Sequence, residues 1–385
     1  MRDIKIDSID NDIYEKVRKN WDAIAKPIDG LGDFEKLICQ IAAITGREYP
    51  DLSKRALIIM CADNGVVKEG VSQTDQSVTR AVTELMTVQK SSVGIMTAGL
   101  GVDSFVVDVG VNGEAVSGTI DKKVASGTRD FLEGPAMSGE QCIQAIEAGI
   151  EIATECAKKG YGIIITGEMG IGNTTTSTAL MCALTGCEPG LVTGAGAGLS
   201  AEGIVRKTEV IEQGLKLHGL MQQSTASTRI DDEVDIIQNR ERKNAEIKGD
   251  GNKQVDIKQV DALHALSCVG GFDIAGLVGV FIGGAINHVP VLIDGFISAV
   301  AAYTAELIAP GTREYMIASH SGRESGTSML LERLGLKPVI YADMALGEGT
   351  GAVMLLPLLD MAYRLYSSGT GFEDTDISSY ERFKP

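Results

Sequence analysis

Two glycine-rich segments of the chain have residue types that could hold a phosphate group. The first, GEMGIGNTTTS at residues 167–177, follows an apolar run and opens into a pattern typical of a helix. Backbone N–H groups at a helix N-terminus attract anions, because they donate hydrogen bonds and the helix dipole is positive there. No lysine follows these glycines, so this is not a Walker loop, and the Thr175 position excludes a dinucleotide fingerprint. The alternative is a tight turn with no ligand.

The second segment, GAGAG at residues 194–198, precedes a predicted helix over 200–220 that carries Arg206 and Lys207. Two such turns could enclose one phosphate ester from two sides. Each could instead connect unrelated elements, but we favour a ligand that both turns share.

Glu348 lies between glycines in LGEGTG, residues 346–351, ahead of an apolar helical pattern. A carboxylate near apolar walls binds its proton more tightly, which suits it to general-base catalysis near neutral pH. The alternative is structural, since glutamate is common in the first turn of a helix.

A further set of polar residues follows the apolar run at 55–62. It contains Asp63, Asn64 and Gly65, and Ser72 and Gln76 come soon after. Polar residues beyond the carboxyl end of a parallel strand lie where open α/β sheets bind ligands. Asp-Asn-Gly is also an ordinary turn sequence.

The elements that must position these residues alternate in type. Continuous apolar runs at 55–62, 104–111, 161–168 and 289–296 are separated by helical patterns such as 138–160. Such runs are typical of strands buried on both faces, and helices between them imply parallel crossovers. The sequence therefore predicts an α/β fold with a parallel sheet covered on both faces.

The chain ends predict a second, smaller unit. Two helices are expected in residues 1–52, and a last helix over 352–366 could pack on them. We predict a small helical domain from residues 1–52 plus 346–385 and a large α/β domain from 53–345. The large domain carries a charged surface insertion at 222–261.

Composition excludes several classes of protein. The net charge of −17 would repel a nucleic acid backbone, and we find no basic patch. The most apolar stretch, 274–286, is too short to span a bilayer, which takes about 20 residues. The seven cysteines contain no C-x-x-C pair and the N-terminus is charged, so we expect a cytoplasmic protein. The four histidines do not cluster, and we predict no metal site, no serine triad and no cofactor.

Nine segments, taken together, resemble the nicotinate-nucleotide:dimethylbenzimidazole phosphoribosyltransferase family of cobamide (vitamin B12) biosynthesis. They are GLGDFEKL (30–37), ADNGVVKEGVSQ (62–73), SGTRDF with GPAM (126–137), TGEMGIGNTTTSTAL (166–180), GAGAGLS (194–200), VGGFDIAGLVG (269–279), PVLIDGFISA (290–299), SH (319–320) and LGEGTGAVMLLPLLDMA (346–362). The resemblance implies a Rossmann-like parallel-sheet domain with a small helical domain built from both chain ends, in a homodimer. It also implies a pentosyltransferase that moves phosphoribosyl from nicotinate mononucleotide to an aromatic base, giving an α-riboside 5′-phosphate and nicotinate.

The same resemblance implies the roles of individual residues. Glu348 becomes the general base and Glu168 lines the base pocket. Phosphate and ribose are expected on Gly172, Asn173, Thr174, Gly196, Gly198 and Lys207, and the base pocket on Asp63, Ser72, Gln76 and Leu346.

These residue types suit the reaction. Nicotinate leaves from a pyridinium cation, so no acid is needed to protonate it. The attacking azole must lose its N–H proton, which one carboxylate can take. A glycosidase needs two carboxylates around the sugar instead.

The sequence departs from the family beside the base pocket. The family commonly has Asp-His-Gly where this chain has Asp63-Asn64-Gly65, and an aromatic-Pro pair where it has Thr74-Asp75. The acceptor could therefore be a hydroxybenzimidazole, a purine or a phenol. A nucleotide-binding oxidoreductase or hydrolase, or a non-catalytic nucleotide-binding homologue, is a further alternative.

Overall fold

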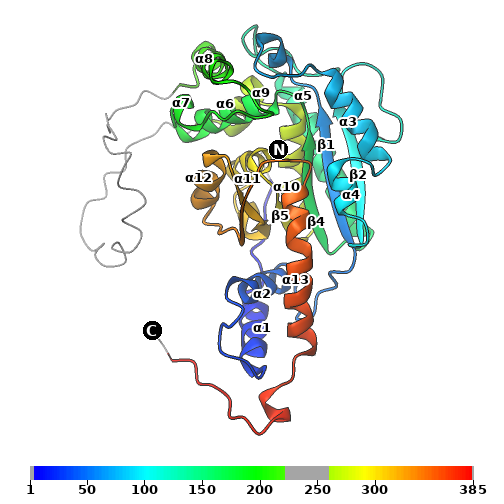
Figure 1. Cartoon of the computed structure of the whole chain (residues 1–385), viewed down its shortest axis with the longest axis vertical. Coiled ribbons are helices and arrows are strands. Elements are labelled where there is room, and N and C mark those ends of the chain that lie inside the picture. The colour runs from blue at the N-terminus through cyan, green and yellow to red at the C-terminus, as the bar shows by residue number, and fades with distance from the viewer. Residues whose placement is uncertain (1–3, 222–259, 384–385) are drawn as a thin grey trace, which may run out of the picture.

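A computed structural model of the chain describes residues 4–221 and 260–383 (Figure 1). Its main sheet has six parallel strands in the order β3-β2-β1-β4-β5-β6. This is the doubly wound order of Rossmann-type folds, with the switch point between β1 and β4. The predicted α/β class and parallel sheet are confirmed, and the strands are β1 (Arg55–Ala62), β2 (Val102–Gly110), β3 (Ile120–Asp121), β4 (Ile163–Met169), β5 (Val291–Ile293) and β6 (Met316–Ala318).

Alternate residues of β1 enter two different cores. Ala56, Ile58 and Met60 belong to one apolar cluster, and Leu57 and Ile59 belong to the other. Because successive side chains of a strand point to opposite faces, a strand covered on both sides must be apolar throughout. That requirement explains the uninterrupted run in the sequence.

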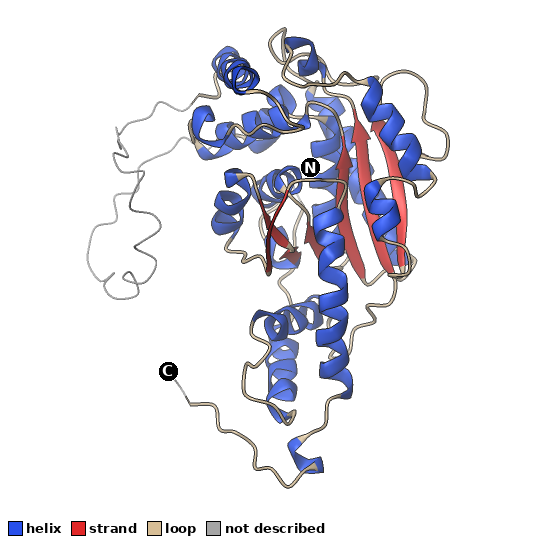
Figure 2. Ribbon diagram, viewed as in Figure 1, coloured by secondary structure: helices blue, strands red, loops and turns tan. Residues whose placement is uncertain are grey.

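Helices cover both faces of the sheet, as Figure 2 shows. The first core contains side chains of α5 (Gly139–Lys158), α6 (Asn173–Thr185), α10 (Phe272–Ile286) and α11 (Phe296–Ile308). The second contains side chains of α2 (Asp33–Thr45), α3 (Ser77–Thr87), α4 (Ser92–Met96) and α13 (Thr350–Ser368). The remaining helices are α1 (Asn11–Ala23), α7 (Pro189–Val192), α8 (Ala201–Leu217), α9 (Ala262–Val269), α12 (Ser325–Leu334) and the 3-10 turns η1 (Gly65–Glu69), η2 (Thr312–Tyr315) and η3 (Phe372–Asp374).

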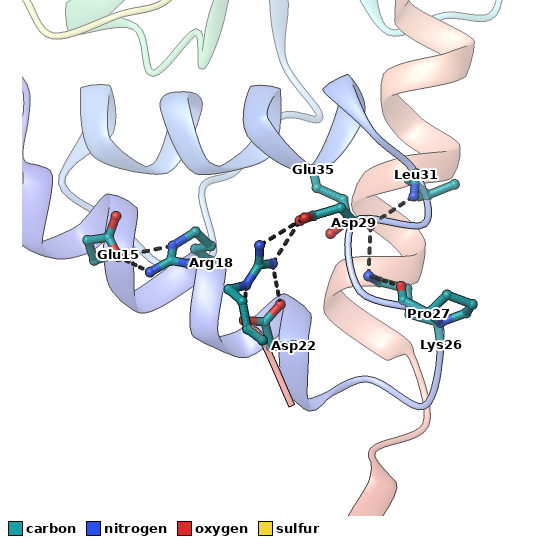
Figure 3. Close-up of polar contacts among 9 residues, drawn as sticks. Glu15, Arg18, Asp22, Lys26, Pro27, Asp29, Leu31 and Glu35 are labelled. Carbon is teal, nitrogen blue, oxygen red and sulfur yellow. Dashed lines mark hydrogen bonds and ion pairs between the residues drawn. The ribbon is translucent and has the colours of Figure 1, made fainter. Parts of the chain in front are cut away.

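Helices α1 and α2 lie beside the lower part of α13, below the sheet (Figure 1). Trp21 of α1 and Tyr366 of α13 have ring centroids 5.2 Å apart, and Ile24 forms an isolated β-bridge with Gly371. The break between α1 and α2 is closed by Glu35, which accepts hydrogen bonds from the Lys26 ammonium (2.7 Å) and the Leu31 N–H (2.8 Å), as Figure 3 shows. Division of the chain into two domains stays a prediction.

The polar sequence SHSGRESG at 319–326 predicts a turn, but part of it is a strand. Residues 320–322 form β7 (His320–Gly322), which pairs in parallel with β8 (Ile340–Met344) in a small second sheet. The predicted insertion at 222–261 lies almost wholly outside the described residues. No described helix is both long and apolar enough to cross a membrane.

Candidate active site

A cavity of about 290 Å³ lies at the carboxyl ends of β4 and β5. Glu168 enters it from the end of β4 and Asp294 from the residue after β5, while residues 344–351 form another wall. A smaller cavity of about 60 Å³ shares Gly170, Thr174 and Gly196 with the larger one, among other lining residues. The two cavities therefore adjoin, and the larger lies beyond the carboxyl ends of parallel strands, where open α/β sheets bind ligands.

Glu348 lines the larger cavity in a strained backbone conformation. Its φ angle is +63°, between glycines at +86° and +96°. A left-handed conformation costs a residue with a Cβ atom roughly 1–2 kcal/mol, and such strain is concentrated at functional sites. The Oε2 atom of Glu348 accepts a hydrogen bond from the Val93 N–H (3.0 Å) at the start of α4. One carboxylate oxygen is thus fixed by the protein.

The turn that carries Glu348 rests on strand β4. A Cβ atom at Gly167 would lie 2.6 Å from the Glu348 carbonyl oxygen, and one at Gly349 would lie 3.0 Å from the Thr166 carbonyl oxygen. Only glycine permits these approaches.

Glu168 is half-buried and faces the same turn. Burial raises the pKa of Glu168 to about 8, the negative charge of nearby Asp273 adds to this, and a hydrogen bond donated by the Asn173 side-chain amide opposes it. The raised pKa favours the protonated, uncharged form of the Glu168 carboxyl group near neutral pH.

Two more carboxyl groups lie beside Glu168 with elevated proton affinity. Burial raises the pKa of Asp273 to about 7 and that of Asp294 to about 6. Asp273 is fully buried behind the wall, and its Oδ1 atom accepts a hydrogen bond from the Ile274 N–H (3.0 Å). The site therefore concentrates buried acidic groups.

The two glycine turns meet at the smaller cavity. Gly172, Asn173 and Thr174 line it from the start of α6, and Ala195, Gly196 and Ala197 line it from the other turn. The Asn173 N–H donates to the Gly170 carbonyl (3.0 Å), whereas no acceptor for the Gly172 or Thr174 N–H occurs among the described hydrogen bonds. Those two groups are the better anion donors.

Lys207 lies behind the same wall. Its Nζ atom donates to Thr174 Oγ1 (2.9 Å) and to the Gly194 carbonyl (3.2 Å), and its side chain is buried. Burial lowers the pKa of Lys207 to about 8, partly offset by the charge of Glu324. Gly198 lines neither cavity, and its carbonyl accepts a hydrogen bond from the Gln73 side chain.

The residues predicted for the base pocket separate into two groups. Leu346 lines the larger cavity and Ser72 the smaller one. Asp63 and Gln76 line neither. Asp63 is buried and accepts a hydrogen bond from the Asn112 N–H (2.7 Å), and Gln76 donates to the Asn64 carbonyl (3.2 Å). Both hold the loop after β1.

Sequence reasoning missed Asp294 and His320, which both line the larger cavity. Asp294 directly follows β5, so the rule that selected Asp63 at the end of β1 could also have selected Asp294. His320 belongs to the SH segment of the family resemblance, but the prediction of a polar turn at 319–326 gave no reason to place it in the site. Among the described residues, no group of three or more histidine, cysteine, aspartate or glutamate side chains is placed to hold a metal ion.

Known proteins resemble this chain over nearly its whole length. A family model described as "Phosphoribosyltransferase" matches residues 6–239 and 238–377. Nicotinate-nucleotide–dimethylbenzimidazole phosphoribosyltransferases are 36% identical in Clostridium acetobutylicum (98% of this chain, 97% of the relative) and 38% identical in Clostridioides difficile (96% of each). The crystal structure of CobT from Thermus thermophilus superimposes with a TM-score of 0.80 at 32% identity, covering 95% of this chain and 99% of that one.

We expect Glu168→Gln to stabilise the ligand-free protein by an amount that grows as the pH rises from about 5 to 8. The pKa of Glu168 is raised from 4.5 to about 8 in the folded state, so folding favours the protonated form. The stability that this proton contributes is complete below about pH 4.5 and is lost as the pH rises through about 8. Glutamine has no proton to lose. Thermal unfolding of both proteins across this range measures the difference.

Glu147→Gln, on the exposed face of α5, is the matched control for loss of one carboxylate. A stability difference between Glu168→Gln and the unmutated protein that stays constant or shrinks over the same range would contradict the assignment.

Proposed function

The chain belongs to this phosphoribosyltransferase family, and we propose that it transfers the phosphoribosyl group of nicotinate mononucleotide to a benzimidazole-type base. The products are nicotinate and an α-riboside 5′-phosphate, as the assembly of the cobamide nucleotide loop requires. One observation carries the proposal: Glu348, Glu168 and the first glycine turn line a single cavity.

Glu348 acts as the general base in this reaction. The Val93 N–H holds its Oε2 atom, which leaves Oε1 to take the proton from the azole as a ring nitrogen attacks C1 of the ribose. Nicotinate leaves from the opposite face as a neutral pyridine ring, so the configuration inverts from β to α. The carboxylate thus acts on the attacking base and not on the sugar, unlike the carboxylate pair of a glycosidase.

Glu168 binds the substrate as an uncharged carboxyl group. With a pKa of about 8 it is protonated at neutral pH, so it can donate a hydrogen bond into the cavity. A second negative charge beside Glu348 would raise the cost of ionising the base, and the proton on Glu168 avoids that cost.

The phosphate group binds in the smaller cavity. The N–H groups of Gly172 and Thr174 and the N-terminus of α6 offer donors, and the Lys207 ammonium adds a positive charge behind Thr174. This contact fixes C1 of the ribose in the larger cavity beside Glu348. Fixed geometry of this kind supplies much of the acceleration in a transfer between two bound molecules.

The cavity walls support a benzimidazole as acceptor. Val82, Met169, Met344 and Leu346 give it apolar surface that suits an aromatic ring with apolar edges. The departures from the family lie elsewhere: Asn64, Thr74 and Asp75 line neither cavity, and the Asp75 carboxylate accepts the Ser77 N–H (2.9 Å). They give no support for a purine or a phenol.

Incubation with nicotinate mononucleotide and a panel of benzimidazoles, purines and phenols tests the proposal directly. We expect nicotinate release together with an α-riboside 5′-phosphate of a benzimidazole, identified by mass spectrometry and by NMR of the anomeric proton. A β-riboside, or hydrolysis to ribose 5-phosphate in the presence of every base, would contradict the proposed transfer.

We expect Glu348→Gln to slow this transfer by a factor on the order of 10²–10⁴, the usual contribution of a general base. Calorimetry should find nicotinate mononucleotide bound within a few-fold of its original affinity, because the phosphate contacts are unchanged. Glu147→Gln again serves as the control. Normal turnover in Glu348→Gln would eliminate Glu348 as the base.

We expect Lys207→Met to weaken binding of nicotinate mononucleotide by about 10-fold at pH 7, because the variant removes the positive charge that lies behind Thr174, next to the proposed phosphate position. Binding of nicotinate riboside, which lacks the phosphate group, should not change. Lys216→Met, on the exposed side of the same helix, is the matched control. Equal losses for the two ligands would mean that Lys207 does not interact with the phosphate group.

We also propose that the chain works as a homodimer in the cytoplasm. The family resemblance supports the dimer, as does an exposed apolar stripe on α13 made by Met354, Leu358 and Met361. Residues at this spacing share one helix face. Sedimentation equilibrium should give twice the chain mass of 40.7 kDa, and a monomer at micromolar concentration would contradict the dimer.

A further inference from the structure

Asp294 binds the backbone of the turn that carries Glu348. Its Oδ2 atom accepts a hydrogen bond from the Gly349 N–H (3.1 Å), and its Oδ1 atom accepts one from the Ala352 N–H (3.0 Å). Gly349 is the N-cap of α13 and has no side chain with which to cap the helix. Asp294 therefore supplies, from a distant part of the chain, the cap that the helix lacks.

The backbone of Asp294 is itself fixed by hydrogen bonds. Its backbone N–H donates to Thr166 Oγ1 (3.3 Å) and Ser298 Oγ (3.2 Å), and these two hydroxyl oxygens lie 2.6 Å apart. Thr166 also donates to the Leu292 carbonyl (2.8 Å). All of these groups are buried, so Asp294 is anchored to both β4 and β5.

The capped N–H of Gly349 belongs to the residue directly after Glu348. The backbone of Glu348 has the left-handed conformation at φ +63°. This conformation is unfavourable for a residue with a Cβ atom, so neighbouring contacts must stabilise it. Asp294 restrains this turn from the sheet side, while the Val93 N–H holds the Glu348 carboxylate from the other side. The His320 ring packs directly against the first turn of α13, since a Cβ atom at Gly351 would lie only 2.0 Å from His320 Cε1.

We infer that Asp294 is a positioning residue for the general base: by holding the first turn of α13, it keeps the carboxylate of Glu348 directed at the azole. The inference rests on the proposed role of Glu348. Asp294 is not assigned any proton transfer, and its action on the reaction passes through the turn.

Asp294 lines the cavity as well as capping the helix, so its negative charge could also act on the substrate directly. Its two bonded partners are neutral N–H groups, and the charged or titratable side chains that share the cavity wall are Glu168, Glu324, Glu348 and His320. No lysine or arginine side chain occurs among the described lining residues. A charge acting directly on a cationic substrate is thus the competing role, and the experiment must separate the two.

Asp294→Asn is the informative variant. The side chain keeps its shape and loses a buried charge, so the fold should persist. The amide has only one acceptor oxygen, and its NH₂ group would face one of the two N–H groups as donor against donor. We expect kcat to fall on the order of 10²-fold, as a displaced catalytic group does, with the KM and calorimetric Kd for nicotinate mononucleotide changed less than about threefold.

A double-mutant cycle with Glu348→Gln identifies how Asp294 acts. If Asp294 acts through Glu348, Asp294→Asn should change the residual rate of Glu348→Gln by less than about threefold. Asp10→Asn is the matched control, because Asp10 caps α1 with two bonds of 3.0 Å and lines neither cavity. It should leave turnover unchanged.

Several results would overturn the inference. Multiplying losses in the double variant would mean that Asp294 acts on its own, for example by its charge. Unchanged kcat in Asp294→Asn would mean that the cap does not matter. If Glu348→Gln kept full turnover, the proposed base would fail, and any defect in Asp294→Asn would then show an action independent of Glu348.

Should melting curves show that Asp294→Asn is unfolded, Ser298→Ala provides the second test. It removes one acceptor of the Asp294 N–H and leaves the carboxylate charge in place. We expect a loss of kcat of a few-fold that is absent in the Glu348→Gln background. An equal loss in both backgrounds would overturn the inference.

Discussion

The site depends on one close backbone approach at the end of strand β4. The carbonyl group of Glu348 lies against Gly167, and the amide of the next residue is bound by Asp294. Any side chain at position 167 would push this turn away from the sheet. Because Glu168 follows Gly167 on the same strand, this contact also sets the separation of the two glutamates. The relative position of the two glutamates therefore depends on the contact between a strand and a turn some 180 residues later in the chain.

The same arrangement places buried acidic groups together, and no lysine or arginine lies among the described residues of the larger cavity wall. Burial raises the pKa of Glu168, Asp273 and Asp294, so ionising each of these groups disfavours the folded state. A core built only for stability would replace them with apolar side chains. Their presence, together with the left-handed Glu348, indicates a site that gives up stability for chemistry.

The sheet and part of the site could be predicted from the sequence, because local patterns record them. The run at 55–62 coincides with β1, since a strand covered on both faces must be apolar throughout. Glu348 and the glycine turns were visible as short motifs. Asp294 and His320 lie within such motifs too, but their roles depend on contacts with residues 31 to 58 positions away, which no local pattern records. Asp63 looked like a pocket residue, yet its carboxylate holds the backbone of Asn112 instead.

In the proposed site, charge favours one orientation of the phosphoribosyl donor. Besides Glu168, whose raised pKa favours the uncharged form, the larger cavity is lined by Asp294, Glu324 and Glu348, and no lysine or arginine occurs among its described lining residues. A phosphate dianion would be repelled there, whereas a pyridinium cation would be attracted. The smaller cavity has the opposite character, with N–H donors at the start of α6 and the Lys207 ammonium behind Thr174. A molecule with a cationic ring at one end and a phosphate group at the other therefore has one favourable orientation, and that orientation brings the bond between ring and sugar to Glu348.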